Sequence, residues 1–230
     1  MTGKILITGA NGQLGVEVVK AFLHAGYHVL AADRSNEHLN VDVHSGSLEF
    51  FQIDLTNDTE AENLGKQLLE KHSPITHALF LAGGFAAGGL DEADAESIRK
   101  MIELNFFSAY NLARPLYREM IRVGAGKVIL VGAKPAIEPR FGSGLIAYTL
   151  SKSLLFSLAG LLNEMGKGEE LSATVIVPGT IDTKTNRDSM PEADVSKWVK
   201  PSAIAEILLF VCSGKADPLR ENILKLYGNG

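Results

Sequence analysis

Cysteine and basic residues are both scarce in this 230-residue sequence. Cys212 is the single cysteine, so no internal disulfide can form, which fits a reducing compartment. The 22 Lys and Arg residues are outnumbered by 27 Asp and Glu residues, which gives a net charge of −5. Because binding to a phosphate backbone relies on a basic surplus, we expect no nucleic-acid partner.

Long apolar runs are missing as well. No stretch approaches the roughly 18 apolar residues that a membrane span needs, and the run Ile5-Leu6-Ile7 is too short for the core of a signal peptide. Repeats, low-complexity tracts and domain linkers are absent from the sequence. With 46% hydrophobic and 21% charged residues, we expect one globular, cytoplasmic domain over residues 1–230, without a membrane partner.

Short apolar runs alternate with longer helical patterns along the whole chain, which predicts a parallel sheet built from strand-helix-strand units. Most runs are continuous in Val, Ile and Leu, as is typical of strands covered on both faces. The expected strands cover residues 4–8, 27–32, 49–53, 77–81, 127–131, 173–177 and 223–227. The expected fold is therefore α/β, a doubly wound Rossmann-type domain with a seven-stranded parallel sheet.

Helical patterns fill the intervals between these strands. The longest expected helix, over residues 98–123, contains Pro115, which predicts a kink or a restart at that point. Residues 179–200 form the one long segment whose charge and proline indicate a loop or a flap of short helices. The other expected helices are the one that starts at Leu14 and those over 61–71, 148–165 and 204–212.

The first expected strand runs directly into a glycine-rich turn, TGANGQLG at residues 8–15, and then into a helix. Glycines at such a turn let the backbone approach a pyrophosphate, whose charge is stabilised at the helix N-terminus. Because the strand and the helix are both present, the motif favours a dinucleotide site over a tight turn without a ligand. The expected cofactor contacts are Gly9, Asn11, Gly12, Gln13, Leu14 and Gly15.

Carboxylates follow the second and third strands. Asp33 has close to the 20-residue offset of a residue that hydrogen-bonds ribose hydroxyls, although it could instead cap a helix or turn. Arg34 could attract a 2′-phosphate. Asp54, with its neighbour Leu55, is placed to meet the adenine edge. We expect NADH as the cofactor, with NADPH as the alternative.

Tyr148 and Lys152 are spaced i and i+4, which places a phenol and an ammonium on one face of a helix. A cation beside a phenol favours the phenolate, so we expect Lys152 to lower the pKa of Tyr148 towards a range useful for proton transfer. Such a pair alone is often only a solvated helix face.

The order of five motifs resembles the short-chain dehydrogenase/reductase family over nearly the whole chain. They are TGANGQLG at 8–15, LAGG at 81–84, Asn105, Tyr148 with Lys152, and PGTIDT at 178–183. The first turn has TGxxGxxG spacing in place of the commoner TGxxxGxG. The resemblance implies a nicotinamide cofactor along the carboxyl edges of the strands.

The same resemblance implies roles for single residues. Tyr148 would be the proton donor, Lys152 would bind the nicotinamide ribose and tune the tyrosine, and Asn105 would hold a water in a proton relay. Thr183 and the backbone near Ile181 would hold the carboxamide. The remaining cofactor contacts implied by the motifs are Ala82, Gly83, Gly84, Pro178 and Gly179.

One member of the family pattern is missing. The catalytic serine normally follows the fifth strand, where this chain has Ala133. Ser143, in a Gly-Ser-Gly loop nearer Tyr148, is the alternative source of a hydroxyl. Three segments resemble the dihydropteridine reductases of the family, which likewise have alanine here: LAGGFAAGG at 81–89, GAKPA at 132–136, and NRDSMPEAD at 186–194 with Trp198 following. Asn105 departs from that subfamily and agrees with the broader family.

This resemblance implies reduction of a quinonoid dihydropterin in a pocket formed by Phe85, Ala133, Tyr148 and Trp198. A carbonyl or quinone reductase is an alternative enzyme. A nucleotide-binding regulator retired from catalysis is a further alternative, which the missing serine permits and the intact Tyr148–Lys152 pair opposes. By analogy with the family, the expected assembly is a homodimer or a homotetramer.

Four histidines lie at the ends of expected elements. His24 and His28 flank the end of the first helix, and His72 and His77 flank the fourth strand. No cysteine or carboxylate stands at metal-ligand spacing from them, so we expect no metal.

Overall fold

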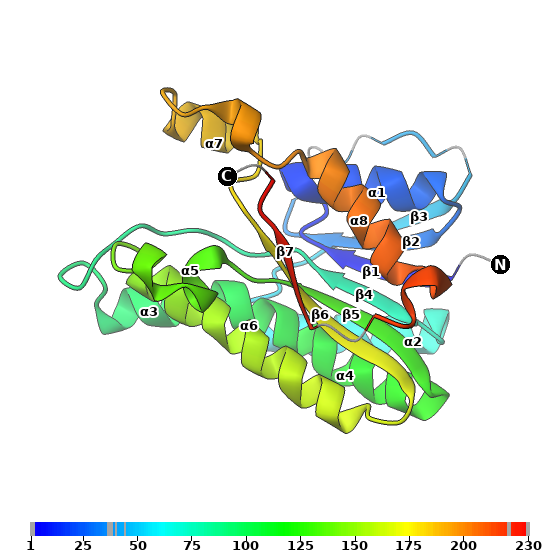
Figure 1. Ribbon diagram of the computed structural model, residues 1–230. Helices are drawn as coiled ribbons and strands as arrows, with labels where there is room; N and C mark the ends of the chain where they lie inside the picture. The colour runs from blue at the N-terminus through cyan, green and yellow to red at the C-terminus, as the bar shows by residue number, and fades with distance from the viewer. Residues whose placement is uncertain (1–2, 36–38, 40, 44, 220–221, 229–230) are drawn as a thin grey trace.

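The computed structural model describes residues 3–35, 39, 41–43, 45–219 and 222–228. Within these residues the chain forms a seven-stranded sheet in the order β3-β2-β1-β4-β5-β6-β7 (Figure 1), with parallel pairing throughout. The strands are β1 (Lys4–Thr8), β2 (His28–Asp33), β3 (Ser47–Gln52), β4 (His77–Phe80), β5 (Ala125–Val131), β6 (Glu170–Pro178) and β7 (Ile223–Leu226). The expected Rossmann-type, seven-stranded parallel fold is confirmed.

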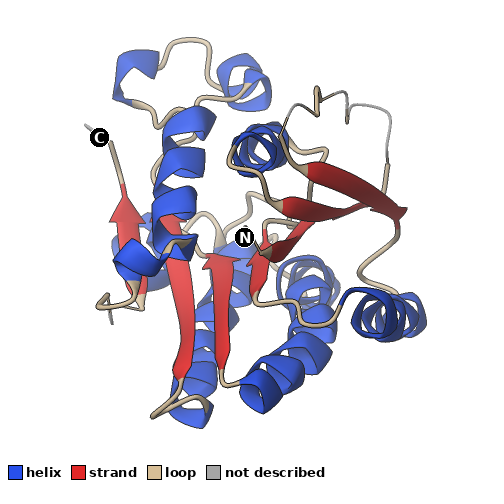
Figure 2. Cartoon of the chain, turned by 90° about the vertical axis from the view of Figure 1, so that its right-hand side faces the viewer, coloured by secondary structure: helices blue, strands red, loops and turns tan. Residues whose placement is uncertain are grey.

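Helices cover both faces of the sheet (Figures 1 and 2). On one face lie α1 (Gln13–His24) and α8 (Pro201–Cys212), and on the other lie α2 (Asp58–His72), α4 (Ser108–Val123) and α6 (Ile146–Met165). The shorter helices are α3 (Ala95–Ile102), α5 (Lys134–Ile137) and α7 (Lys184–Ser189), with 3-10 turns η2 (Pro139–Phe141), η3 (Val195–Lys197) and η4 (Gly214–Ala216).

The strand order reverses between β1 and β4. From β1 the chain proceeds outwards to β3, then returns to β4 on the other side of β1. In doubly wound sheets, ligands bind outside the carboxyl ends of the strands at such a switch point. The topology therefore places a ligand crevice at the ends of β1 and β4.

The central strand β1 shows why the apolar runs are continuous. Leu6 packs into the core shared with α2, α4 and α6, whereas Ile5 and Ile7 pack into the core shared with α1 and α8. All three side chains are completely buried. Because successive side chains point to opposite faces, a strand covered on both faces needs apolar residues at every position.

All seven expected strands are present at the expected places, and all but β1 differ from the sequence prediction at one or both ends. The largest difference is in β6, which begins at Glu170 because its ladder with β5 extends back to the pair Ala125↔Glu170. Polar residues at a strand end carry no apolar signal, so backbone pairing alone extends the strand.

The expected restart of the helix at Pro115 is wrong. Helix α4 continues through Pro115, whose ring packs against Gly65 of α2, where an added Cβ would lie 3.0 Å from the Pro115 Cγ atom. The irregular turn lies earlier, where the π-helix η1 (Glu103–Phe107) joins α3 to α4. This wider turn directs Asn105 into the interior, where the residue is 1% exposed.

Residues 179–200 contain the expected short helices, α7 and η3. A single bridge between Ile181 and Val199 closes the base of this segment. Within the described residues, no helix combines the length and the apolar composition needed to cross a membrane.

Candidate active site

The glycine turn joins β1 to α1 at the switch point. Gly9 has φ of +67°, a conformation that residues with a Cβ rarely adopt, and an added Cβ there would lie 2.6 Å from the amide nitrogen of Ala82. A Cβ on Gly15 would overlap the carbonyl oxygen of Gly9. Gly12, the N-cap of α1, has no side chain with which to cap the helix. The turn therefore brings bare backbone close to the positive end of α1, which suits an anionic ligand.

Asn11 supplies independent evidence that a ligand belongs here. Its Oδ1 and Nδ2 atoms are both buried, and neither has a hydrogen-bond partner among the described residues. An unpaired buried polar group costs about 1–3 kcal/mol. A nucleotide bound on the turn could pair with both atoms, so the residues present fit the expected dinucleotide.

Asp33 lies beside this turn, as expected. Its Oδ2 atom accepts a hydrogen bond from the backbone N–H of Asn11 (3.0 Å), and its Oδ1 atom accepts one from Ser35 (3.3 Å). Asp33 therefore also caps a turn, which was the alternative role that the sequence allowed. These two bonds hold the carboxylate at the end of β2, next to the turn.

Asp54 and Arg34 lie near one another at the same edge. The Thr56 hydroxyl and backbone N–H donate to Oδ1 of Asp54 (2.7 and 3.0 Å), and these bonds, with the nearby Arg34 charge, lower the pKa of the Asp54 carboxyl. Leu55 is buried in the core. Any contact between Leu55 and a cofactor would therefore involve its backbone.

Tyr148, Lys152 and Asn105 converge on the loop that follows β4. Oδ1 of Asn105 accepts a hydrogen bond from the backbone N–H of Gly84 (2.9 Å). A Cβ added to Gly83 would lie 2.5 Å from that Oδ1 atom and 3.2 Å from Nζ of Lys152. The ammonium of Lys152, from α6, and the amide of Asn105, from the π-helix η1, therefore meet beside Gly83.

Ser151 connects the two elements, and the sequence motifs did not identify it. The residue is fully buried, accepts a hydrogen bond from Nδ2 of Asn105 (3.0 Å) and donates one to the carbonyl oxygen of Tyr148 (2.7 Å). The available signal was a serine in the stripe that α6 buries, four residues from Ala147 on one side and from Leu155 on the other.

The expected lowering of the Tyr148 pKa is wrong for this structure. Burial raises the pKa of Tyr148 to about 12, and burial lowers the pKa of Lys152 to about 8. Nζ of Lys152 donates instead to the carbonyl oxygen of Val131 (2.8 Å). At neutral pH the phenol thus keeps its proton and the ammonium is mostly charged, which is the protonation state that a proton donor requires.

The residues expected around the substrate differ in their exposure to solvent. The Phe85 ring is 65% exposed and meets the Tyr148 ring edge to face, with centroids 5.1 Å apart. Ala133 follows β5 and is buried, so it supplies no hydroxyl. Ser143 is exposed, and its carbonyl oxygen would be 3.5 Å from a Cβ on Gly89. Trp198 is half-buried after η3 and takes part in none of the ring pairs recorded for the described residues.

The segment after β6 contacts the glycine turn directly. Nε2 of Gln13 donates to the Thr185 hydroxyl (3.0 Å), and Oε1 of Gln13 accepts from the backbone N–H of Lys184. The hydroxyl of Thr183 accepts from the N–H of Asn186 (3.2 Å) as the N-cap of α7. Gln13 therefore joins the turn to α7, a role beyond the cofactor contact expected for it.

Gly179 and Ile181 lie at the base of the same segment. The N–H of Gly179 donates to the carbonyl oxygen of Leu226 (2.9 Å), which fixes the end of β6 against β7. The carbonyl oxygen of Ile181 accepts from Nδ2 of Asn186 (2.8 Å). Pro178, the last residue of β6, precedes this turn.

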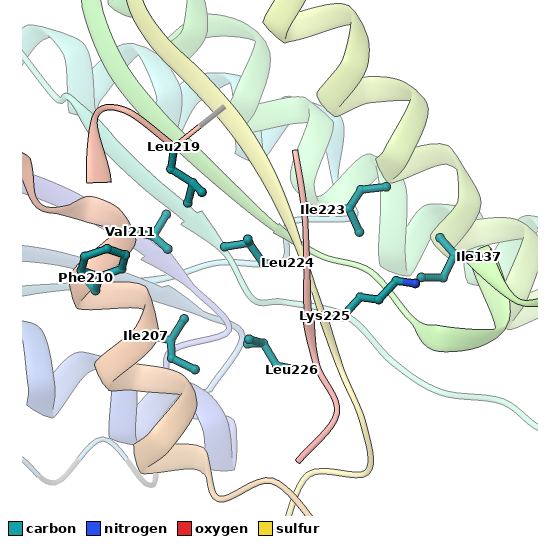
Figure 3. Close-up of a pocket in the computed structure, with 9 residues that line it drawn as sticks. All are labelled: Ile137, Ile207, Phe210, Val211, Leu219, Ile223, Leu224, Lys225 and Leu226. Atoms are coloured by element: carbon teal, nitrogen blue, oxygen red, sulfur yellow. The ribbon is translucent and has the colours of Figure 1, made fainter. Parts of the chain in front are cut away.

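An apolar pocket of about 700 Å³ lies elsewhere, between α8 and β7 (Figure 3). None of the cofactor or catalytic candidates lines it. Its lining residues are Ile137, Ile207, Phe210, Val211, Leu219, Ile223, Leu224, Lys225 and Leu226.

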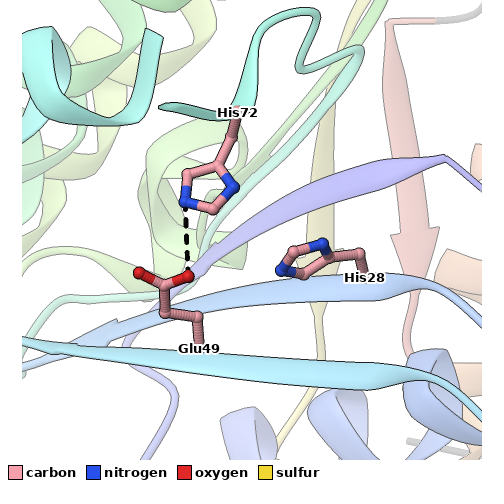
Figure 4. A group of neighbouring side chains, drawn as sticks. All are labelled: His28, Glu49 and His72. Atoms are coloured by element: carbon pink, nitrogen blue, oxygen red, sulfur yellow. Dashed lines mark ion pairs between the residues drawn. The ribbon is translucent and has the colours of Figure 1, made fainter. Parts of the chain in front are cut away.

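The sequence argument against a metal is incomplete. Glu49, which is distant from the histidines in sequence, lies beside His28 and His72 in the structure (Figure 4). Pairing of β3 with β2 brings the carboxylate there, and sequence spacing alone could not show this.

Comparisons with known proteins agree with this fold. The family model described as short chain dehydrogenase matches residues 3–194. Dihydropteridine reductase of Dictyostelium discoideum is 30% identical over 220 residues, which cover 94% of this chain and 90% of that protein. The 7alpha-hydroxysteroid dehydrogenase of Escherichia coli K12 is 25% identical over 98% of this chain and 92% of its own length.

Solved structures show the same fold. A putative NAD(P)-dependent gluconate 5-dehydrogenase from Beutenbergia cavernae, with bound NADP, superposes with a TM-score of 0.89 at 21% identity, covering 98% of this chain and 95% of that one. A short-chain dehydrogenase/reductase from Mycobacterium ulcerans has a TM-score of 0.88 at 21% identity, covering 99% and 89%. With the family match over residues 3–194, the chain belongs to the short-chain dehydrogenase/reductase family of NAD(P)-dependent oxidoreductases.

Proposed function

We propose that this oxidoreductase reduces a quinonoid dihydropterin, with Tyr148 as the proton donor. The observation that carries the proposal is Ala133, a buried alanine after β5 where the family normally has its catalytic serine. The 30% identity to a dihydropteridine reductase supports the same substrate class.

The chain's own residues supply the proton and the orientation. When bound, NAD(P)H supplies the hydride. Tyr148, protonated because burial raises its pKa to about 12, donates the proton that completes the reduction. Lys152, held by the Val131 carbonyl oxygen, places its ammonium beside Gly83, where it can bind ribose hydroxyls. Asn105 orders the Gly84 backbone at the same point.

The absence of a serine hydroxyl at Ala133 supports a quinonoid dihydropterin as the substrate. Reduction of a carbonyl concentrates negative charge on one oxygen, which a serine hydroxyl normally stabilises. Reduction of a quinonoid dihydropterin spreads the charge over ring nitrogens, so a single acid suffices. The exposed Phe85 ring, edge-on to Tyr148, offers a surface against which a flat ring can stack. Trp198 and the flap at 179–200 are proposed to close the pocket.

The proposed cofactor is NADH. The Asp33 carboxylate stands beside the glycine turn, where it would accept bonds from ribose hydroxyls and repel a 2′-phosphate. Arg34 acts in the opposite direction, and its charge also faces Asp54. A kcat/KM ratio that favours NADPH would show that Arg34 dominates. Cytoplasmic location and assembly into a homodimer or homotetramer stay predictions.

A steady-state assay tests the substrate. Loss of NADH is followed with quinonoid dihydropterin and, in parallel, with a panel of ketones, aldehydes and quinones. We expect efficient reduction of the pterin and poor reduction of simple ketones. Tyr110→Phe, at a half-buried tyrosine on α4, is the matched control for Tyr148→Phe. A wild-type protein that reduces ketones well and ignores the pterin contradicts the proposal.

A carbonyl or quinone reductase is the second candidate. Asn105 follows the broader family, and the similarity to a hydroxysteroid dehydrogenase supports a ketone substrate. Ser143 would then supply the hydroxyl, so Ser143→Ala should lower ketone turnover and leave pterin turnover unchanged.

A further inference from the structure

A cluster of two histidines and a glutamate lies at the amino-terminal end of the sheet. His28 is the first residue of β2, Glu49 lies in β3, and His72 is the last residue of α2 (Figure 4). The candidate active site lies at the carboxyl ends of the strands. The cluster is therefore separate from the residues that bind the cofactor.

The fold itself directs the three side chains to one point. In β2, His28 and Leu30 lie on the same face, and Leu30 packs into the core shared with α2. Glu49 pairs with Leu30 across the ladder, so its side chain lies on that face too. His72 continues the α2 stripe formed by Leu64 and Leu68, which faces the sheet.

The ligand atoms have the separation of a metal site. One ligand atom from each residue lies within 4.8 Å of the others. A tetrahedral zinc ion with bonds of about 2.0–2.2 Å holds its ligand atoms about 3.3–3.6 Å apart. The distance between Nε2 of His72 and Oε2 of Glu49 is 3.4 Å, within that range.

The bonding state of His72 also indicates a ligand. The residue is 4% exposed, and its buried Nε2 atom makes no hydrogen bond among the described residues; it faces Oε2 of Glu49, the ion pair drawn in Figure 4.

Two lysine ammonium groups contact the residues of the cluster. Nζ of Lys71 donates to the other carboxylate oxygen of Glu49 (2.7 Å), which orients Oε2 towards His72. Nζ of Lys4 donates to the carbonyl oxygen of His72 (2.8 Å). These two ammonium groups lower the affinity for any divalent cation. The ligand atoms, two histidine nitrogens and one carboxylate oxygen, suit a zinc-class ion more than a hard cation such as Ca²⁺, which needs six or more oxygen ligands.

We propose that His28, Glu49 and His72 bind one zinc-class divalent cation, with water completing the tetrahedron. The ion cross-links β2 and β3 to the carboxyl end of α2. Its role is structural, because the three residues lie at the amino-terminal end of the sheet, opposite the carboxyl ends of the strands that hold the candidate active site. Its presence therefore stabilises the folded state and leaves the chemistry at the carboxyl ends unchanged.

The experiment measures binding of Zn²⁺ to metal-stripped, tag-free protein by competition with a chromophoric chelator. We expect one Zn²⁺ per chain, and an affinity at least about tenfold lower in Glu49→Gln and in His28→Gln, each of which removes one ligand. Matched controls are His24→Gln, at an exposed histidine outside the cluster, and Glu62→Gln, at an exposed acid of α2. Both controls should bind as the wild type does.

Two further readouts keep the test independent of folding defects. Co²⁺ should give the visible absorption of a four-coordinate ion in the wild type and lose it in Glu49→Gln. Zn²⁺ should raise the melting temperature of the wild type, chelation should reverse the rise, and Glu49→Gln should show neither change. Absence of stoichiometric binding in the wild type overturns the proposal, as does binding that persists in Glu49→Gln and His28→Gln.

Discussion

The hydroxyl of Ser151 holds Asn105 against α6, and its removal should be costly. Ser151→Ala eliminates the bond from Nδ2 of Asn105 (3.0 Å) and the bond to the Tyr148 carbonyl oxygen (2.7 Å). The Nδ2 donor of Asn105 then retains only a 3.9 Å contact with the sulfur of Met101, while its Oδ1 atom keeps the bond from Gly84. Because both residues are buried, bulk water cannot replace the lost hydroxyl.

The size of the effect follows from two opposing contributions. A buried donor left without a partner costs about 1–3 kcal/mol. Alanine is the better helix former by about 0.5 kcal/mol, which offsets part of that cost in α6. The free energy of unfolding should therefore fall by about 0.5–2.5 kcal/mol. With a urea m-value of about 3 kcal/mol/M, the unfolding midpoint should fall by about 0.2–0.8 M.

Ser153→Ala is the matched control for this assay. Ser153 is on the same helix and donates to the carbonyl oxygen of Thr149 (2.8 Å), but its hydroxyl is not bonded to Asn105. Urea unfolding followed by circular dichroism should place Ser153→Ala within about 0.5 kcal/mol of the wild type. In the pterin assay, Ser151→Ala should have the lower turnover, because Asn105 keeps only its bond with Gly84. Equal stability and equal turnover in the two variants would refute the role assigned to Ser151.

Three other changes should separate the parts of the site. Tyr148→Phe should lower turnover by about 10²-fold or more and keep the cofactor Kd within a few-fold, since it removes the proton donor alone; wild-type turnover would exclude Tyr148 from the mechanism. Ala133→Ser should leave kcat/KM for the pterin within about tenfold, equivalent to about 1.4 kcal/mol, and a larger change would show that the reaction is sensitive to a hydroxyl at that position. Burial lowers the Lys152 pKa from 10.5 to about 8, so between these values the unfolded chain binds more protons and this group makes stability rise with pH. Lys152→Met should remove that rise in urea unfolding measured at about pH 8 and pH 10, and an unchanged pH dependence would show that Lys152 is not the group responsible.

Local sequence pattern was sufficient for the sheet, the dinucleotide turn and the Tyr148–Lys152 pair. Continuous apolar runs identify strands covered on both faces. Gly9 is needed because its positive φ, which the local turn imposes, is rarely adopted by residues with a Cβ. Of the three residues that the family motifs assign to catalysis, Asn105 and Lys152 meet beside Gly83, and Tyr148 contacts the Phe85 ring of the same loop.

Tertiary structure decided the features that depend on residues distant in sequence. Desolvation of Tyr148, which reversed the expected direction of its pKa shift, depends on everything packed around α6. The link from Asn105 to Ser151 spans 46 residues and the contact of Gln13 with Thr185 spans 172, so no spacing rule could identify either. The approach of Glu49 to His28 and His72 exists only because β3 pairs with β2 and α2 packs across them. Sequence patterns report what a residue requires of its immediate neighbours, whereas burial and long-range pairing are properties of the assembled fold.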